Sequence, residues 1–282
     1  MARLLFALRM MRARFDSARS ACPYCQSRAY SFIERKKMLI EARECCDCGL
    51  IYRWPIDQKR DNRLFYENAY EKIEKNISAP PKDLLQQLIQ QRFKNSPWDK
   101  THRVEFIKRL AERGGRLLDF GCSWGYGAYQ YADLGFEVMG FEIDRKRAAL
   151  GRSKLKVEIY SGWSEIPNSI CFDVILADHS LEHLHNLRQA LEEFRRHSKT
   201  GAKLVIFVPN GTRSQAGSPG AKWKQLIGET HTAAFTIDWF SKNLPRHGFH
   251  PEFFANSGEP LRDREDAQNQ DEIALAATRK GP

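Results

Sequence analysis

The chain has 282 residues, of which 42% are hydrophobic, so it can bury the core of one large domain or of one domain with a small appendage. Its sequence contains no run of eighteen apolar residues, which excludes a membrane-spanning helix of ordinary length. Its first fourteen residues lack the uninterrupted apolar stretch of a secretory signal, so we expect a cytoplasmic protein.

The formal net charge of +10 is unevenly distributed. Residues 1–113 hold 24 Lys and Arg against 14 Asp and Glu, whereas residues 114–282 hold 21 of each. A cationic accessory region suits an anionic partner such as nucleic acid, a phosphorylated substrate or an anionic membrane surface. A solvated surface with surplus arginine explains the same charge, and no basic run with interleaved aromatics marks a nucleic-acid groove.

Residues 1–19 predict a basic N-terminal arm that forms a short helix. Apolar side chains fall on one helical face and arginines elsewhere, and that apolar face comprises Leu4, Leu8, Met11 and Phe15. Such an arm either makes a peripheral contact with an anionic membrane or, as is commoner, packs on its own protein.

Residues 20–56 carry two Cys-x-x-Cys pairs with nineteen residues between them, which predicts a zinc ribbon. Two such turns brought together close a tetrahedron of thiolates around Zn²⁺. The odd number of seven cysteines disfavours a disulfide framework. The segment is too small for a core of its own, so metal binding would supply most of its folding free energy. The candidate ligands are Cys22, Cys25, Cys45 and Cys48, which leaves Cys46 as a spare thiol.

Residues 57–113 predict a helical connector before the main domain. We expect helices over residues 57–76, 82–95 and 98–113. Two prolines separate the first two helices, and Gly114-Gly115 ends the third. Aromatic side chains in this layer either line a substrate cleft or, more commonly, pack against the main domain.

The most informative stretch opens the main domain, which we place at residues 114–282. An apolar strand enters a turn that carries Gly121 and Gly125, and a second apolar strand ends about twenty residues later at Glu142. Glycines let the backbone approach a ligand closely, and a carboxylate at this strand tip can accept hydrogen bonds from both hydroxyls of a ribose. The stretch therefore predicts a site for an adenosine-containing ligand.

The same turn lacks the dinucleotide fingerprint, because Ser123 and Tyr126 stand where Gly-x-Gly-x-x-Gly requires glycines. Strands and helices then alternate, which predicts an α/β, Rossmann-like, mainly parallel seven-stranded sheet with helices on both faces. The expected strands are 116–120, 137–141, 156–160, 173–177, 202–208, 249–255 and 271–277. The expected helices are 126–134, 144–153, 183–197 and 236–247.

Four motifs resemble those of class I S-adenosylmethionine-dependent methyltransferases in their order and spacing. They are Leu117 to Gly125, Phe141 to Asp144, Phe172 to Leu184 and Gly201 to Asn210. The usual first motif of that family has a further glycine where Ser123 stands. The resemblance covers residues 100–255 and implies S-adenosylmethionine as the methyl donor.

The cysteine pairs extend the resemblance. The second pair runs into Gly49-Leu50-Ile51-Tyr52, with Pro55 soon after, and this looks like the N-terminal zinc module of a set of bacterial methyltransferases. Several members of that subgroup act on small molecules such as nucleotide-linked sugars. The resemblance implies that the zinc is structural and that the module helps to cover the substrate side.

The resemblance also implies roles in donor binding. Asp119 and Gly121 would support the methionine portion, Glu142 the ribose and Ile143 one face of the adenine. Trp163 would stack on the adenine, although relatives place an aspartate at this turn. The complete set of expected donor-binding residues is Asp119, Gly121, Cys122, Gly125, Glu142, Ile143, Trp163 and Asp178.

The motif after the fourth strand holds the first candidate for a general base. An O–H or N–H acceptor benefits from a base, and His has the pKa nearest neutrality. His179 is the first candidate, and His231, in a long loop over residues 209–235, is the second. Methyl transfer without any single base is the remaining alternative, and His183 is expected to cap or pack a helix.

The expected function is methyl transfer to a small-molecule acceptor, such as a sugar or a nucleotide-linked metabolite. An anionic acceptor would suit the basic accessory region. An RNA methyltransferase that binds nucleic acid through the basic zinc module is an alternative. A non-catalytic binding protein that has kept the fold is another.

Overall fold

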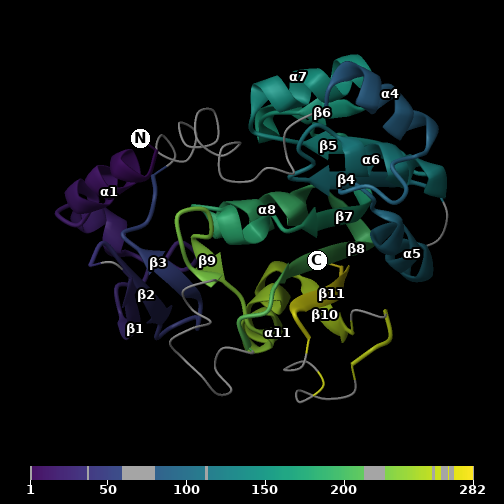
Figure 1. Cartoon of the computed structure of the whole chain (residues 1–282). Helices are drawn as coiled ribbons and strands as arrows, with labels where there is room; N and C mark the ends of the chain where they lie inside the picture. Colours follow the sequence, from purple (N-terminus) through teal and green to yellow (C-terminus); the bar gives the residue numbers. More distant parts are fainter. Residues whose placement is uncertain are drawn as a thin grey trace.

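The computed structural model describes residues 2–36, 38–58, 80–111, 114–212, 226–255, 258–261, 266 and 270–281. Within them the chain forms a seven-stranded sheet and a four-stranded sheet, which lie in two adjacent parts of the molecule (Figure 1). Among the described helices, none combines the length and the apolar character that a bilayer-spanning segment requires.

The larger sheet has the strand order β10-β11-β8-β7-β4-β5-β6. Its strands are β4 (Arg116–Phe120), β5 (Glu137–Phe141), β6 (Glu158–Tyr160), β7 (Phe172–Asp178), β8 (Ser198–Pro209), β10 (Phe249–Phe254) and β11 (Glu272–Arg279). Strands β4 to β8 run parallel to one another, whereas β11 is antiparallel to both of its neighbours, β8 and β10. The predicted seven-stranded, mainly parallel sheet is confirmed. Its strand order reverses beside β4, where open α/β sheets bind ligands.

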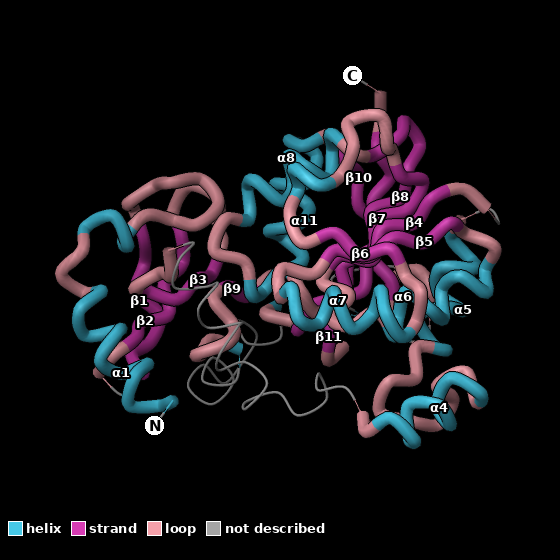
Figure 2. The backbone as a smooth tube through the Cα atoms, turned by 90° about the horizontal axis from the view of Figure 1, so that it is seen from above, coloured by secondary structure: helices cyan, strands magenta, loops and turns pink. Residues whose placement is uncertain are grey.

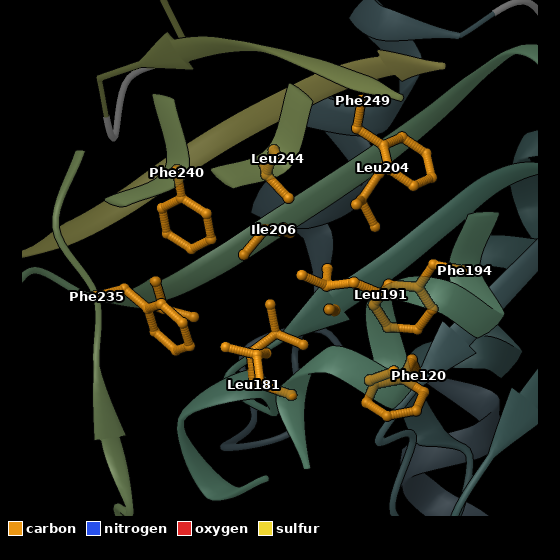
Figure 3. Packing of buried hydrophobic residues seen from close by; sticks show 14 of the residues in the cluster. Phe120, Leu181, Leu191, Phe194, Leu204, Ile206, Phe235, Phe240, Leu244 and Phe249 are labelled. Atoms are coloured by element: carbon orange, nitrogen blue, oxygen red, sulfur yellow. The ribbon is translucent and has the colours of Figure 1, made fainter. Parts of the chain in front are cut away.

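Helices cover both faces of this sheet, because successive side chains of a strand point to opposite sides. On one face, Leu118 and Phe120 pack with α8 (Leu187–Arg196) and α11 (Ile237–Asn243), as Figure 3 shows for part of this cluster. On the other face, Leu117 packs with α5 (Thr101–Leu110) and α6 (Tyr126–Tyr131).

Two connector helices are shorter than the sequence predicts. α4 (Lys82–Gln90) ends five residues early, because Arg92, Phe93 and Asn95 adopt positive φ values that a right-handed helix does not accommodate. α5 begins at Thr101, whose backbone N–H donates to the side chain of Asp99 at 2.8 Å. The expected helix over residues 57–76 lies, except for its first two residues, outside the described part of the chain.

Two boundaries in the main domain also differ from the expected ones. α8 begins at Leu187 and not at residue 183, because the Asn186 side chain caps it by accepting from the backbone N–H of Gln189. β6 begins at Glu158, since Lys156 has a φ of 60°. The remaining helix, α7 (Arg145–Lys154), agrees within a residue with its expected range.

The smaller sheet joins the cysteine-containing segment to the main domain. It consists of β1 (Tyr30–Lys36), β2 (Ile40–Cys45), β3 (Ile51–Trp54) and β9 (Ala233–Ala234), all antiparallel. The strand β9 belongs to the segment after β8, and it pairs with Ile51 and Tyr52 of β3. Viewed from above, β9 and α11 lie between β1–β3 and the seven-stranded sheet (Figure 2).

The cysteine-containing segment shares the core of the main domain. Its buried residues, among them Leu50 and Tyr52, belong to the same apolar cluster as those of α8 and α11. Tyr24 packs edge-on against Trp239 with ring centroids 5.1 Å apart, and its hydroxyl lies 3.0 Å from Nε2 of His247. These contacts dock the segment on α11 and on the turn that follows it.

The N-terminal helix α1 (Ala2–Ala13) forms as predicted, and its predicted apolar face is not the face that packs on the protein. Leu8 and Met11 are 41% and 43% exposed, whereas Met10 is buried; the side chain of Leu4 lies outside the description. Met10 and Ala13 are buried on the side that packs on the protein. Two ion pairs flank this side: Arg9 pairs with Asp57 at 3.5 Å, and Arg14, just after the helix, pairs with Glu41 and stacks over Trp54.

Candidate functional site

A cavity of about 490 Å³ opens at the carboxyl ends of β4, β5 and β7, where the strand order reverses. Its volume falls in the range of small-molecule sites. Six of the predicted site residues line it, namely Gly121, Glu142, Ile143, Asp178, His179 and His231. The chain thus brings residues from four separate segments to one cavity.

The turn after β4 is built for a close backbone approach. Gly121 has a φ of +81°, and a Cβ at this position would stand 2.7 Å from Cβ of Ser180. Ser123 also adopts a positive φ, of 54°, which explains why glycine is usual at this motif position. The buried hydroxyls of Ser123 and Ser180 line the cavity and have no hydrogen-bond partner among the described residues.

Glu142 ends β5 beside this turn. Its Oε1 accepts from the backbone N–H of Asp144 at 2.8 Å, and burial raises the pKa of its carboxyl group. The next residue, Ile143, exposes 42% of its surface, unusually much for a large apolar side chain. A carboxylate and an apolar surface therefore lie side by side at the edge of the cavity.

Four residues of the expected donor set do not line the cavity: Asp119, Cys122, Gly125 and Trp163. Gly125 caps α6 with a φ of 82°, and Cys122 is buried below the turn. Burial raises the pKa of Asp119 to about 7. Trp163 stacks on Phe141 with ring centroids 4.4 Å apart, and Phe141 lines the cavity in its place.

Asp178 lies between two cations that the sequence reasoning missed. Lys100 Nζ is 2.7 Å from Oδ2 of Asp178, and a guanidinium nitrogen of Arg103 is 3.0 Å from its Oδ1. Burial alone would raise the pKa of Asp178, but these cations hold it well below its usual range. The only pattern in the sequence that indicates these cations is the Lys-x-x-Arg spacing at the start of a helix. This spacing does not predict which carboxylate the two side chains contact.

Arg103 connects Asp178 to His179 through Glu272, the first residue of β11. Its guanidinium makes two bonds of 2.7 and 2.8 Å to Glu272, which lies 3.1 Å from Nε2 of His179. Nδ1 of His179 lies 3.2 Å from Glu182. The side chain is 46% exposed, and its two carboxylate partners raise the pKa of His179 to about 10, which favours the imidazolium form.

Glu182, His183 and His231 form a second cluster on the cavity wall. One ligand atom from each lies within 4.8 Å of the others. The two imidazole rings meet edge to face with centroids 4.9 Å apart, and burial lowers the pKa of both. The sequence pattern predicts a capping or packing role for His183 and does not indicate this cluster.

The segment that carries His231 is held from two sides. On the inner side, the backbone N–H of Thr232 donates to the carbonyl of Glu182 at 2.8 Å. On the outer side, the buried Arg53 of β3 donates to the carbonyls of Gly228 and Glu229 at 2.9 and 3.0 Å. The cysteine-containing sheet thus positions one wall of the cavity. Residues 213–225 of the predicted loop lie outside the described chain.

The four predicted zinc ligands converge. Sγ of Cys22 is 3.6 Å from Sγ of Cys48, and Sγ of Cys25 is 3.4 Å from Sγ of Cys45. A tetrahedral zinc with Zn–S bonds of 2.3 Å requires sulfur atoms about 3.8 Å apart. All seven cysteines are free, and Cys46 is exposed outside the cluster. The donor set and its spacing fit a zinc ion.

Comparisons with known proteins bear on this site. The family described as "Methyltransferase domain" matches residues 79–252. A Mycolicibacterium smegmatis protein named as a probable S-adenosylmethionine-dependent methyltransferase is 32% identical over 118 residues, which are 40% of this chain and 46% of that protein. A Mycobacterium tuberculosis protein of the same description is 28% identical over 157 residues, 54% and 55% of the two chains.

The chain therefore spans about half the length of the curated relatives it matches. Among solved structures, a TehB-like SAM-dependent methyltransferase from Corynebacterium glutamicum superposes with a TM-score of 0.50 at 17% identity, over 71% of this chain and 97% of that one. This likeness supports the fold. Because the family match covers more than half of its residues, this chain belongs to the methyltransferase domain family.

Proposed function

We propose that this chain transfers a methyl group from S-adenosylmethionine to a small-molecule acceptor, such as a sugar or a nucleotide-linked metabolite. The observation that carries the proposal is the shared cavity: the glycine turn and Glu142 line one part of it, and Asp178, His179 and His231 line another. A donor and an acceptor bound there would lie against each other, as a displacement reaction requires.

The donor part of the cavity would be formed by the turn after β4 and the end of β5. Glu142 would accept hydrogen bonds from the ribose hydroxyls, and the exposed side chain of Ile143 would cover one face of the adenine. Gly121 lets the backbone reach the methionine portion without a side chain intervening. When bound, the donor supplies an activated methyl group on a sulfonium.

The protein's contribution to the reaction would be to orient the two reactants and to exclude water. Phe120 and Phe141 provide an apolar wall, and Asp178 keeps its negative charge beside Lys100. His179 and His231 remain the candidates that contact the acceptor. His179 already bridges two carboxylates, so an acceptor that uses it must displace one of them.

We further propose that Cys22, Cys25, Cys45 and Cys48 hold a structural Zn²⁺ ion. Supporting this proposal, the four sulfur atoms lie together, and the sheet around them supplies the strand that pairs with β9. The ion would fix the turns on either side of β1 and β2. Through Arg53 and β9, it would then also fix the wall that carries His231.

Calorimetry with S-adenosylmethionine on the zinc-loaded protein tests the proposed activity. Glu142→Ala should weaken donor binding by about 1–3 kcal/mol through the loss of hydrogen bonds to the ribose. The matched control is Glu252→Ala, because Glu252 is an exposed glutamate on β10 at the opposite edge of the sheet. If Glu142→Ala bound the donor with unchanged affinity, Glu142 would not be the residue that binds the ribose.

Assays of product formation, together with donor calorimetry, separate the alternatives. Formation of S-adenosylhomocysteine with sugar nucleotides supports a small-molecule acceptor. Methylation of tRNA or rRNA, with binding that falls steeply as salt rises, would instead identify an RNA methyltransferase. A protein that binds no donor at all would be non-catalytic, and the proposal would then fail.

A further inference from the structure

The cluster of Glu182, His183 and His231 has the composition of a metal site, and it is distinct from the four cysteines. Two imidazoles and one carboxylate are the ligand set of many catalytic zinc sites and of non-haem iron sites. Glu182 and His183 come from the turn after β7, and His231 comes from the segment before β9. The fold therefore joins two segments 48 residues apart to make this cluster.

The carboxylate of Glu182 provides independent evidence for a cation. Its side chain is 1% exposed, and its Oε2 is buried without a hydrogen-bond partner among the described residues. An ionised oxygen buried in this way is costly unless it is paired or coordinates a metal. Its other oxygen, Oε1, already contacts Nδ1 of His179 at 3.2 Å, so Oε2 is the oxygen left for an ion.

The surrounding hydrogen bonds orient these side chains as outer-shell partners do in metal sites. Nδ1 of His183 lies 3.1 Å from the carbonyl of Thr230, and a carbonyl can only accept, so Nδ1 carries the proton. The lone pair of that ring is then on Nε2. Ligating histidines typically donate their second ring nitrogen to a carbonyl or carboxylate in this manner. Thr232 holds the adjoining backbone to Glu182 and Leu184.

We infer that Glu182, His183 and His231 bind a first-row divalent metal ion, such as Zn²⁺ or Fe²⁺, with its remaining coordination positions open to the cavity. Tetrahedral bonds of 2.0–2.2 Å place ligand atoms about 3.4 Å apart, so the three atoms, now within 4.8 Å of one another, must draw together by up to about 1.4 Å. Since the three residues line the cavity, an oxygen atom of a bound molecule can complete the coordination.

This site would define the acceptor class, a deduction that rests on the proposed function. A hydroxyl or carboxylate oxygen bound to the ion would be held at the end of the cavity that His179 and Asp178 also line. The ion would lower the pKa of a coordinated hydroxyl, as it does for coordinated water. A coordinated hydroxyl would release its proton to water, so its oxygen would take the methyl group without a histidine base and the donor would leave as S-adenosylhomocysteine. His231 would then serve as a ligand.

Metal titration of the full chain with Co²⁺ alone tests the inference without reference to activity. The metal-free protein should take up two equivalents. One equivalent should give the intense thiolate-to-cobalt charge-transfer band of a cysteine site, and the other should bind with weak d–d absorption only. Metal analysis after gel filtration should likewise give two ions per chain.

Two substitutions should remove the second equivalent while leaving the cysteine band intact. They are Glu182→Gln, which keeps the shape of the side chain, and His231→Ala. Affinity for that equivalent should fall by at least about a hundredfold, because outer-shell partners alone are worth 10–100-fold. The matched control is His250→Ala, an exposed histidine on β10, which should still bind two equivalents.

Retention of the charge-transfer band in each variant shows that the cysteine site is intact, and an unchanged midpoint of denaturant unfolding shows that the main domain is folded. A wild-type protein that binds cobalt only at its cysteines overturns the inference, and so does a His231→Ala protein that still binds two equivalents. The proposed function is tested separately by donor calorimetry. Donor binding without a second ion would refute the metal site alone, and a second ion without donor binding would refute the proposed function alone.

Discussion

The two ends of the cavity, which we propose hold the donor and the acceptor, are assembled in different ways. The donor end comes from one continuous stretch, Gly121 to Ile143, on two neighbouring parallel strands. The acceptor end combines α5, the turn after β7, the segment before β9 and the start of β11. The donor end therefore depends on local structure, whereas the acceptor end depends on contacts between segments far apart in the sequence.

Loss of the cysteine site should separate the two ends most strongly. Cys25→Ser should abolish turnover, because the sheet that pairs with β9 and positions His231 would lose the proposed zinc ion. Donor affinity should change by less than about 0.5 kcal/mol, as expected for sites that share no partners. Zinc content, calorimetry and turnover measure the three effects, with the exposed Cys46→Ser as the control. Loss of donor binding together with turnover would show that the two ends are not separable.

Arg103→Met should be the next largest perturbation. It leaves Asp178 with Lys100 alone and the partly exposed Glu272 with His179 alone, and the loss of these charged hydrogen bonds costs about 3 kcal/mol of unfolding free energy. Denaturant unfolding measures this change. Arg109→Met on the same helix, where Arg109 is 55% exposed, should stay within about 0.5 kcal/mol. Equal effects in the two variants would contradict the role of Arg103.

The contact between Gly121 and Ser180 joins the two ends, and it can be tested directly. Gly121→Ala should cost about 1–3 kcal/mol, because the residue has positive φ and the new Cβ would meet Ser180. Adding Ser180→Gly should restore part of that loss by removing the opposing Cβ. Unfolding free energies of the two single variants and the double variant give the coupling, and strict additivity would show that the contact is unimportant.

Asp119 should produce the smallest effect, a pH dependence of donor binding. Burial raises its pKa to about 7, so the carboxyl is mostly protonated below that pH in the free protein. A cationic donor favours the carboxylate and lowers this pKa, so affinity should fall by up to about tenfold per pH unit below pH 7. Asp119→Asn should bind weakly and independently of pH. A wild-type affinity that is constant between pH 6 and 8 would contradict this expectation.

The same raised pKa has a consequence for stability. Asp119 has a folded-state pKa above the ordinary value of 3.8, so its protonated form is favoured in the folded protein. Its contribution to stability is therefore fully present below about pH 4 and is lost as the pH rises toward 7. Donor binding in that range would offset the loss by placing a positive charge nearby.

The sequence predicted the fold well where the pattern is local. Alternating strands and helices gave the seven-stranded sheet, because a buried parallel strand reads as an apolar run of characteristic length. Helix ends were less predictable. The positive φ values after Gln90 and the Asn186 cap decide where α4 and α8 stop and start, and neither follows from hydrophobic periodicity.

The orientation of α1 shows why a face cannot always be assigned from apolar spacing. Leu8 and Met11 satisfy the helical period, yet they are exposed. Met10 and Ala13 are buried in their place, and Arg9 and Arg14 pair with Asp57 and Glu41 beside them. Apolar spacing indicates that a helix has a face, but the partner surface decides which face is buried.

The sequence by itself determined the glycine turn, the carboxylate at the end of β5, the four cysteines and the parallel sheet, because each depends on neighbours within one motif. Only the tertiary structure decided that Lys100 and Arg103 meet Asp178, that His179 is held between two carboxylates, and that His231 joins Glu182 and His183. These groups lie on different elements. Their proximity follows from how the helices and the small sheet dock on the strands, and no local sequence pattern encodes that docking.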